Sequence, residues 1–275
     1  MNIDAHQHFW IYDAERDSWI TEDMSVIRRD FLPTDLRAEL HSNRMDGVIA
    51  VQASCTLQET QFLVDLSTMY GMIKGVVGWV DLTADDVEDH LERFSKIPII
   101  KGFRHVVQGE DDPEFLMRDS VQRSIRALTK YGFTYDLLIR PRHFASTLLC
   151  VKENPDQQFI LDHMAKPDIK AGEVEQWASF IADLATYPNV VCKVSGLVTE
   201  ADWSNWTVSD FAAYIDHVIL HFGKDRLMFG SDWPVCLVAS TYKQTKEIAG
   251  SRLDGFSLEE QAAFWGETAR RIYKF

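Results

Sequence analysis

Two histidines separated by one residue, His6 and His8, stand near the start of the chain. If this segment is a β-strand, alternate residues share a face, so both imidazoles point the same way while Gln7 points the opposite way. Two imidazoles that converge in this manner can bind one metal ion or one substrate. The alternative is a packed or hydrogen-bonded pair of histidines in the core.

Two further candidates each close a short apolar segment, namely His163 and Asp232. Imidazole nitrogens together with a carboxylate oxygen suit Zn²⁺ or a similar divalent ion. A carboxylate beside such a site can also take a proton from water as a general base. An aspartate after a strand is often only the N-cap of the next helix. The dipeptide Trp233-Pro234 that follows argues against a helix that runs straight on.

The elements that must position these residues alternate along the chain. Short apolar or β-branched runs are followed by longer helical patterns, about eight times. The expected strands are Asn2–His8, Gly47–Ala53, Ile73–Leu82, Ile99–Val107, Thr134–Arg140, Gln158–His163, Val190–Gly196 and Arg226–Asp232. The expected helices are Pro33–Met45, Leu57–Tyr70, Ala84–Lys96, Pro113–Tyr131, Pro141–Asn154, Glu173–Tyr187, Val208–Phe222, Thr241–Ile248 and Ser257–Tyr273.

Eight strand-helix units in 275 residues predict one α/β domain over residues 1–275, a closed (β/α)8 TIM barrel. An open doubly wound sheet is the weaker alternative, because no Gly-rich phosphate-binding sequence follows any strand. In such a barrel the active site lies at the carboxyl ends of the strands. The histidines and Asp232 all fall at such ends, so we expect them to meet there.

The composition limits the class of partner. The 28 basic and 42 acidic residues leave a net charge of −14, which makes nucleic acid and an anionic membrane poor partners. The four cysteines are well separated and read as free thiols, and neither a signal peptide nor a transmembrane run is expected. We therefore expect a cytoplasmic enzyme with a small-molecule substrate. A homodimer remains open, because barrel enzymes often form one.

Several charged or polar residues fall inside expected strands, where a barrel tolerates charge only if it is paired or near the mouth. Lys193 shares a face with Ser195, whereas Arg104 and His105 have opposite parity, so a bulge or strand end is needed to bring both into the site. These cations could polarise a carbonyl or hold a carboxylate or hydroxyls. The alternative is internal salt bridges with residues such as Asp81, Asp136 and Asp162.

Aromatic and amide side chains supply candidate substrate contacts. Gln52 and Trp79 lie near the ends of the second and third expected strands. Trp10 and Trp203 lie in two long loops, 9–32 and 197–207, that follow the first and seventh strands. Long loops in a compact domain are usually functional or disordered, and aromatic content argues against disorder. These tryptophans would cover a sugar ring bound in the barrel mouth. The alternative is that they close the mouth as part of the hydrophobic core.

Six segments together resemble the amidohydrolase superfamily, and within it the TIM-barrel metal-dependent hydrolases that include sugar lactonases of the L-fucono- and L-rhamnono-lactonase kind. The segments, in family order, are Ile3–Trp10, Asp30–Leu36, Lys101–His105, Leu161–Pro167, Lys193–Leu197 and Gly230–Val235. The resemblance implies an amidohydrolase-type barrel. It also implies that His6, His8, His163 and Asp232 form the metal site and that Asp232 activates water.

The resemblance has departures that bear on the metal. The carboxylated lysine of binuclear members has no clear match, because Lys101 lies early in its strand, and the fifth strand offers Asp136 but no histidine. One divalent ion, most simply Zn²⁺, is therefore expected, and in this group even that ion can be dispensable.

The function that the resemblance implies is hydrolysis of an aldonic acid lactone, with His163 or the ion stabilising the oxyanion. Asp232 or His105 would return a proton to the ring oxygen. Two alternatives stay open: a metal-dependent decarboxylase of an aromatic or muconate-like acid, and a non-catalytic sugar-acid binding protein.

Overall fold

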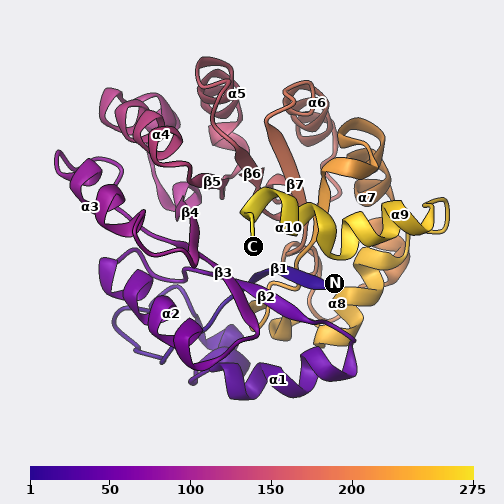
Figure 1. Ribbon diagram of the computed structural model, residues 1–275. Coiled ribbons are helices and arrows are strands. Elements are labelled where there is room, and N and C mark those ends of the chain that lie inside the picture. The colour runs from indigo at the N-terminus through magenta and orange to yellow at the C-terminus, as the bar shows by residue number, and fades with distance from the viewer.

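Eight parallel strands pair in chain order from β1 to β8, and helices surround them (Figure 1). The computed structural model describes residues 1–275. The strands are β1 Ile3–Gln7, β2 Gly47–Val51, β3 Ile73–Gly78, β4 Ile100–His105, β5 Thr134–Leu137, β6 Phe159–Leu161, β7 Val190–Val194 and β8 Leu227–Phe229. The (β/α)8 TIM barrel predicted from the sequence is confirmed.

The helices that follow the strands cover the outside of the barrel. They are α1 Pro33–Ser42, α2 Leu57–Met69, α3 Val87–Phe94, α4 Asp119–Tyr131, α5 Phe144–Glu153, α6 Glu175–Leu184, α7 Val208–Phe222 and α8 Tyr242–Gly250, with α9 Leu258–Ala262 and α10 Thr268–Tyr273 at the end of the chain. None of them combines the length and the apolar character that crossing a membrane requires.

Every strand lies inside its expected range, but most stop two or more residues early at the carboxyl end. The residues beyond each end turn out of the sheet into the loops at one mouth of the barrel. His8, His163 and Asp232 are therefore in loop segments directly after β1, β6 and β8, not in the strands themselves.

Two expected helices are divided. The helix expected over 113–131 is a short 3₁₀ turn, Phe115–Met117, and then α4, because Arg118 is extended between them (φ −57°, ψ 137°). The helix expected over 257–273 is interrupted by a π-helical turn, Ala263–Glu267. A side chain at Gly266 would meet the carbonyl oxygen of Met1 at 2.0 Å, so the turn accommodates close packing on the N-terminus.

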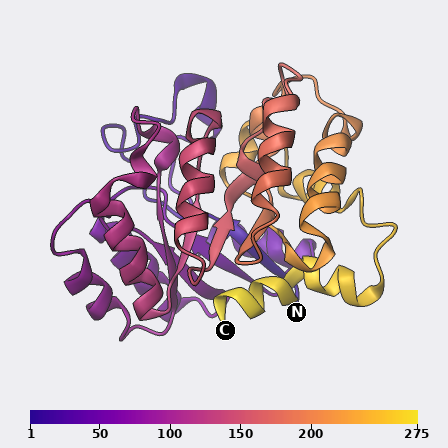
Figure 2. The same ribbon diagram turned by 90° about the horizontal axis from the view of Figure 1, so that it is seen from above.

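The core has an outer and an inner part. The outer part fills the space between strands and helices. The inner part fills the barrel with apolar side chains that include Ile49, Val77, Ile160 and Met228, and α10 closes its lower end. Figure 1 shows α10 across that opening, and Figure 2 shows the loop after β1 at the opposite end. An apolar floor thus separates the polar mouth from the closed end.

The barrel closes beyond the end of its last strand. β8 has only three residues, and the bridge to the first strand joins Gln7 to Trp233, beyond the end of β8. The backbone N–H of Asp232 donates to the carbonyl of His6 at 2.8 Å, and that of His8 donates to the carbonyl of Trp233 at 2.7 Å. The seam between the first and last strands is therefore held by the segments that carry the candidate site.

Candidate active site

The direction of the first two histidines depends on an irregularity in β1. Ala5 packs into the inner core, and the register with β2 shifts between Asp4 and Gln7. A bulge adds one residue to a strand and changes which side chains face inward. His6 and His8 therefore both face the barrel axis, and their Nε2 atoms lie 3.2 Å apart.

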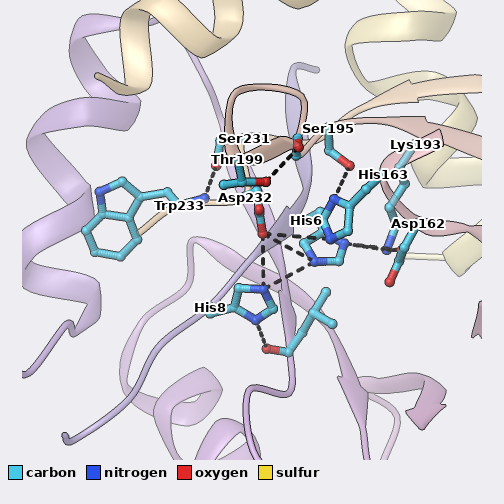
Figure 3. Close-up of polar contacts among 12 residues, drawn as sticks. His6, His8, Asp162, His163, Lys193, Ser195, Thr199, Ser231, Asp232 and Trp233 are labelled. Carbon is cyan, nitrogen blue, oxygen red and sulfur yellow. Dashed lines mark hydrogen bonds and ion pairs between the residues drawn. The ribbon is translucent and has the colours of Figure 1, made fainter. Parts of the chain in front are cut away.

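Asp232 lies at the centre of the three histidines (Figure 3). Its Oδ1 atom is 3.4 Å from Nε2 of His8, 3.8 Å from Nε2 of His6 and 3.9 Å from Nε2 of His163. All four side chains are buried or nearly so. Residues from three strand ends, 155 and 69 positions apart from His8 to His163 and from His163 to Asp232, thus converge on one point.

The other ring nitrogen of each histidine has a partner that orients the imidazole. Nδ1 of His8 lies 2.8 Å from the carbonyl oxygen of Val51, and Nδ1 of His163 lies 2.9 Å from Oγ of Ser195. Nδ1 of His6 lies 3.2 Å from Nζ of Lys193 and 3.3 Å from Asp162 Oδ1. Because a carbonyl oxygen only accepts, the bond to Val51 requires a proton on Nδ1 of His8 and leaves the lone pair on its Nε2, as in many metal sites.

The donor set fits one divalent ion. Tetrahedral zinc with bonds of about 2.0–2.1 Å places its ligand atoms about 3.3 Å apart, close to the separations found around Asp232. His6, His8 and Asp232 form one group of convergent donors. Burial lowers the pKa of His6 and of His163 well below the ordinary value, so both rings are neutral at pH 7 and able to ligate. Arg104 Nη1, 3.2 Å from His6 Nε2, competes for one lone pair.

A left-handed turn presents His163 to the site. Four consecutive residues, 163–166, have φ between 51° and 60°, a conformation that costs about 1–2 kcal/mol per L-residue. Gly196, on the neighbouring loop, also has positive φ, and a Cβ atom there would lie 2.5 Å from Nδ1 of His163. The imidazole therefore packs directly against bare backbone.

Substitution of Gly196 by alanine tests this close contact. The new methyl group would push His163 away from Ser195, and a misplacement of about 1 Å can cost about 100-fold in rate. We expect kcat/KM of Gly196→Ala to fall by about 10- to 100-fold in a folded protein. The measurement is steady-state turnover of the aldonic acid lactones that the resemblance implies, beside a circular-dichroism melt.

Gly132→Ala is the matched control. Gly132 also has positive φ (76°), at the end of α4, but nothing lies within 4 Å of the added carbon. It should lose a similar amount of stability, about 1–2 kcal/mol, with unchanged kcat/KM. Equal activities for the two variants would contradict the proposed contact.

A layer of buried charge lies directly beneath the histidines. Nζ of Lys193 is 2.5 Å from Asp136 Oδ2 and 3.0 Å from Asp162 Oδ1, and Arg104 Nη1 is 3.1 Å from Asp162 Oδ2. Burial raises the pKa of Asp136 to about 6. For Asp162 burial acts in the same direction, but Lys193, His6 and Arg104 outweigh it and hold the pKa well below its usual range. Two cations and two carboxylates balance in this layer.

A second buried carboxylate supports the segment around Asp232. Asp4 Oδ1 accepts from the backbone N–H of Ser231 at 2.9 Å and from that of His6 at 3.1 Å, and Oδ2 accepts from Tyr242 Oη at 3.0 Å. Burial raises the pKa of Asp4 to about 6. Asp4 thus connects the segment that carries His6 with the segment that carries Asp232, from the outer side of β1.

A pocket of about 770 Å³ opens above Asp232 at the loop end of the barrel. Its walls combine cations, carboxylates, aromatic rings and small polar side chains. They include Arg16, Trp19, Met24, Ser54, Cys55, Thr56, Gln108, Arg140, Lys166, Thr199, Glu200 and Trp203, together with His8, Arg104, His163 and Asp232. This volume suits a single sugar-sized ligand.

Five of the residues predicted from the sequence line the pocket: His8, Arg104, His163, Trp203 and Asp232. His6 lies directly behind them, fully buried.

Gln52 and Lys193 are also near but do not reach the pocket surface. Gln52 is fully buried and accepts from Arg104 Nη2 through its Oε1 at 2.8 Å, so it orients that guanidinium. The ammonium group of Lys193 forms the salt bridges that lie beneath the pocket. The internal salt bridges that the sequence left open are thus formed, with Asp136 and Asp162 and not with Asp81.

Three predicted site residues do not join the group. Nε2 of His105 is 2.7 Å from Glu110 Oε1 and its ring stacks on Phe115, because the inward position on β4 belongs to Arg104. Trp10 is buried with its Nε1 donating to the carbonyl of Arg29 at 2.8 Å. Trp79 does not line the pocket either.

Other pocket residues were missed by sequence reasoning. Arg140, Lys166 and Glu200 follow β5, β6 and β7 and line one wall. Of these three residues, only Lys166 could have been suspected from the sequence, because it lies three residues after His163. Trp19, in the first long loop, also lines the pocket.

Comparison with known proteins agrees with this geometry. Residues 3–275 match the amidohydrolase family. The chain belongs to this family. A solved amidohydrolase from Burkholderia multivorans, with bound zinc, superposes with a TM-score of 0.95 at 36% identity, over 100% of this chain and 99% of that one.

Among curated proteins, this amidohydrolase is similar to enzymes named for sugar lactones. An L-fucono-1,5-lactonase from Burkholderia multivorans is 36% identical over 99% of this chain and 96% of its own length. An L-rhamnono-gamma-lactonase from Scheffersomyces stipitis is 26% identical over 65% and 58% of the two chains. A 2,6-dihydroxybenzoate decarboxylase shares only the fold, at 13% identity and a TM-score of 0.72.

Proposed function

We propose that this amidohydrolase opens a sugar lactone, the cyclic ester of an aldonic acid, to its open-chain acid. The observation that carries the proposal is Asp232, a carboxylate placed among three imidazoles at the base of a sugar-sized pocket. The similarity to the L-fucono-1,5-lactonase of Burkholderia multivorans supports a lactone as the substrate. The partner implied is a small polyhydroxylated molecule.

The first step is attack by water on the lactone carbonyl. Asp232 accepts a proton from the water, and the oxygen forms a bond to the carbonyl carbon. Negative charge develops on the former carbonyl oxygen. Arg104, a pocket-lining cation held by Gln52 and Asp162, is the group of this chain placed to stabilise that charge.

The second step opens the ring. The tetrahedral intermediate collapses, the bond to the ring oxygen breaks, and the alkoxide takes a proton. Asp232, protonated in the first step, returns that proton, because His105 is held by Glu110 outside the pocket lining. The carboxylate is then ready for another cycle.

We also propose that His6, His8, His163 and Asp232 hold one zinc ion. When bound, such an ion supplies a Lewis acid and lowers the pKa of water. The convergent donors of His6, His8 and Asp232 support it, as does the zinc present in the related Burkholderia multivorans structure. Metal analysis of the purified protein, compared with His8→Ala, tests the ligand set without reference to activity.

The activity is tested with a panel of aldono-1,4- and aldono-1,5-lactones, by proton release to a pH indicator. We expect turnover well above spontaneous hydrolysis for at least one lactone. A second arm adds chelator: a rate that survives removal of the ion would overturn the zinc requirement and leave the lactone assignment intact.

The two rival activities are tested beside the lactone panel, with candidate acids added as substrates and ligands. Release of CO₂ from aromatic or muconate-like acids, with every sugar lactone left intact, would replace hydrolysis by decarboxylation. Binding of aldonic acids without turnover of any lactone would indicate a binding protein.

A further inference from the structure

One wall of the pocket carries a row of three charged side chains that the proposed chemistry does not use. Glu200 contacts both neighbours: its Oε2 accepts a hydrogen bond from Nη1 of Arg140 at 3.0 Å, and its Oε1 forms an ion pair with Nζ of Lys166 at 3.1 Å. Arg140 lies in the loop after β5, Lys166 in the loop after β6 and Glu200 in the loop after β7. All three line the pocket.

The Lys166–Glu200 pair of this row is more buried than an ordinary surface salt bridge, whereas the Arg140 side chain is 42% exposed. The Glu200 side chain is 10% exposed and that of Lys166 is 13% exposed. Ion pairs on the surface, such as Lys96 with Glu92, are more than half exposed. Burying charge costs free energy unless each group keeps its hydrogen bonds. The exposed fraction that remains opens into the pocket, where a ligand can complete those bonds.

The hydrogen-bonding capacity left in the row matches a pair of hydroxyl groups. An ammonium group has three N–H donors, and each carboxylate oxygen accepts more than one hydrogen bond. Lys166 and Glu200 therefore offer a free donor and a free acceptor side by side. A hydroxyl group both accepts and donates, so two neighbouring hydroxyls can bridge the two residues.

An aromatic ring stands on the same loop. Nε1 of Trp203 donates to the carbonyl of Thr199 at 3.0 Å, which fixes the indole beside Glu200. The backbone of Glu200 is held in turn, because its carbonyl accepts from the N–H of Lys170 at 3.0 Å. An indole face suits the C–H face of a sugar ring. The loop thus presents an apolar platform and a polar edge together.

The row is also tied to the reacting centre. Lys166 ends the left-handed turn that begins at His163, so a single rigid segment positions both. A ligand held at Lys166 and Glu200 is therefore placed at a constant distance from His163 and Asp232.

We propose that Lys166, Glu200, Arg140 and Trp203 form a subsite that binds two adjacent hydroxyl groups of the sugar lactone. This inference rests on the proposed function and makes the enzyme selective for hydroxylated lactones. Arg140 is a positioning residue, since it orients the Glu200 carboxylate from the more exposed side.

The test compares an aldono-1,5-lactone that the wild type hydrolyses with δ-valerolactone, which has the same six-membered ring and no hydroxyls. Loss of a hydrogen bond to a charged group costs about 1.5–3 kcal/mol. We expect the ratio of the two kcat/KM values to fall about 10- to 100-fold in Glu200→Gln and in Lys166→Met. An unchanged ratio, whether or not both rates fall, would overturn the subsite.

A binding measurement keeps the test independent of turnover. Calorimetric binding of the open-chain aldonate should weaken about 10- to 100-fold in Glu200→Gln. If instead the wild type binds a dicarboxylic aldarate more tightly than the aldonate, the row is an anion site and the hydroxyl assignment is wrong. Lys224→Met, which removes a surface pair with Glu260, is the matched control and should change nothing.

The two proposals can fail separately. Aldonate binding that depends on Glu200, without turnover of any lactone, would retain the subsite and reject the lactonase. Turnover of sugar lactones with a selectivity that Glu200 and Lys166 do not affect would retain the lactonase and reject the subsite.

Discussion

Replacing Asp232 by asparagine is expected to lower kcat/KM for lactone hydrolysis by about 10²- to 10⁴-fold, the range for loss of a general base. The amide has the shape of the carboxylate and can still accept the hydrogen bonds that a neutral oxygen accepts. It cannot take a proton from water at neutral pH, nor return one to the ring oxygen. The measurement is the initial rate of proton release, with protein concentration corrected for the folded fraction.

The control for this substitution is Asp216→Asn on α7, which breaks a surface salt bridge with Arg252. Its kcat/KM should equal that of the wild type. If Asp232→Asn keeps more than a tenth of the wild-type kcat/KM, Asp232 is not the base, and the proton must go to another group of the site.

Replacing Lys193 by methionine should lower the free energy of unfolding by about 3–5 kcal/mol, the usual cost of breaking a buried ion pair. Lys193 is fully buried and serves Asp136 and Asp162 together. Without the ammonium group, two carboxylates face each other in the barrel, with only Arg104 and His6 beside Asp162 and Tyr273 beside Asp136. Urea unfolding followed by fluorescence measures the loss.

A second substitution separates charge from packing. Lys193→Met with Asp136→Asn removes the carboxylate that the lysine served, so it should recover more than half of the lost stability. Lys130→Met is the matched control, because its pair with Glu88 is on the surface, where such pairs contribute about 0–1 kcal/mol. If Lys193→Met alone is as stable as Lys130→Met, charge pairing does not stabilise the buried layer.

The strand order and the meeting of His6, His8, His163 and Asp232 could be predicted, because both follow from local rules. Alternation within a strand predicts that two histidines one residue apart face the same way. Parallel strands in a barrel bring their carboxyl ends to one mouth. The bulge in β1 could not be predicted, although it decides which face the two histidines take.

Arg104 and His105 show where the sequence pattern becomes ambiguous. Neighbours in a strand face opposite sides, and both are polar enough to serve a site. Pairing decides between them, since Asp162 and Gln52 inside the barrel need the guanidinium, whereas Glu110 and Phe115 outside accept the imidazole.

The subsite residues lay beyond sequence reasoning for a different reason. Arg140, Lys166 and Glu200 are 26 and 34 positions apart, on three loops without periodic structure. Only the barrel brings those loops together.

The seam that closes the barrel also couples folding to activity. The amide hydrogens of His8 and Asp232 are the same ones that join the last segment to the first. A fluctuation that parts the ends of the sheet must therefore separate Asp232 from His6 and His8. We expect a partly open barrel to be inactive for this reason, and hydrogen exchange at these two amides to follow the loss of activity as temperature or denaturant concentration rises.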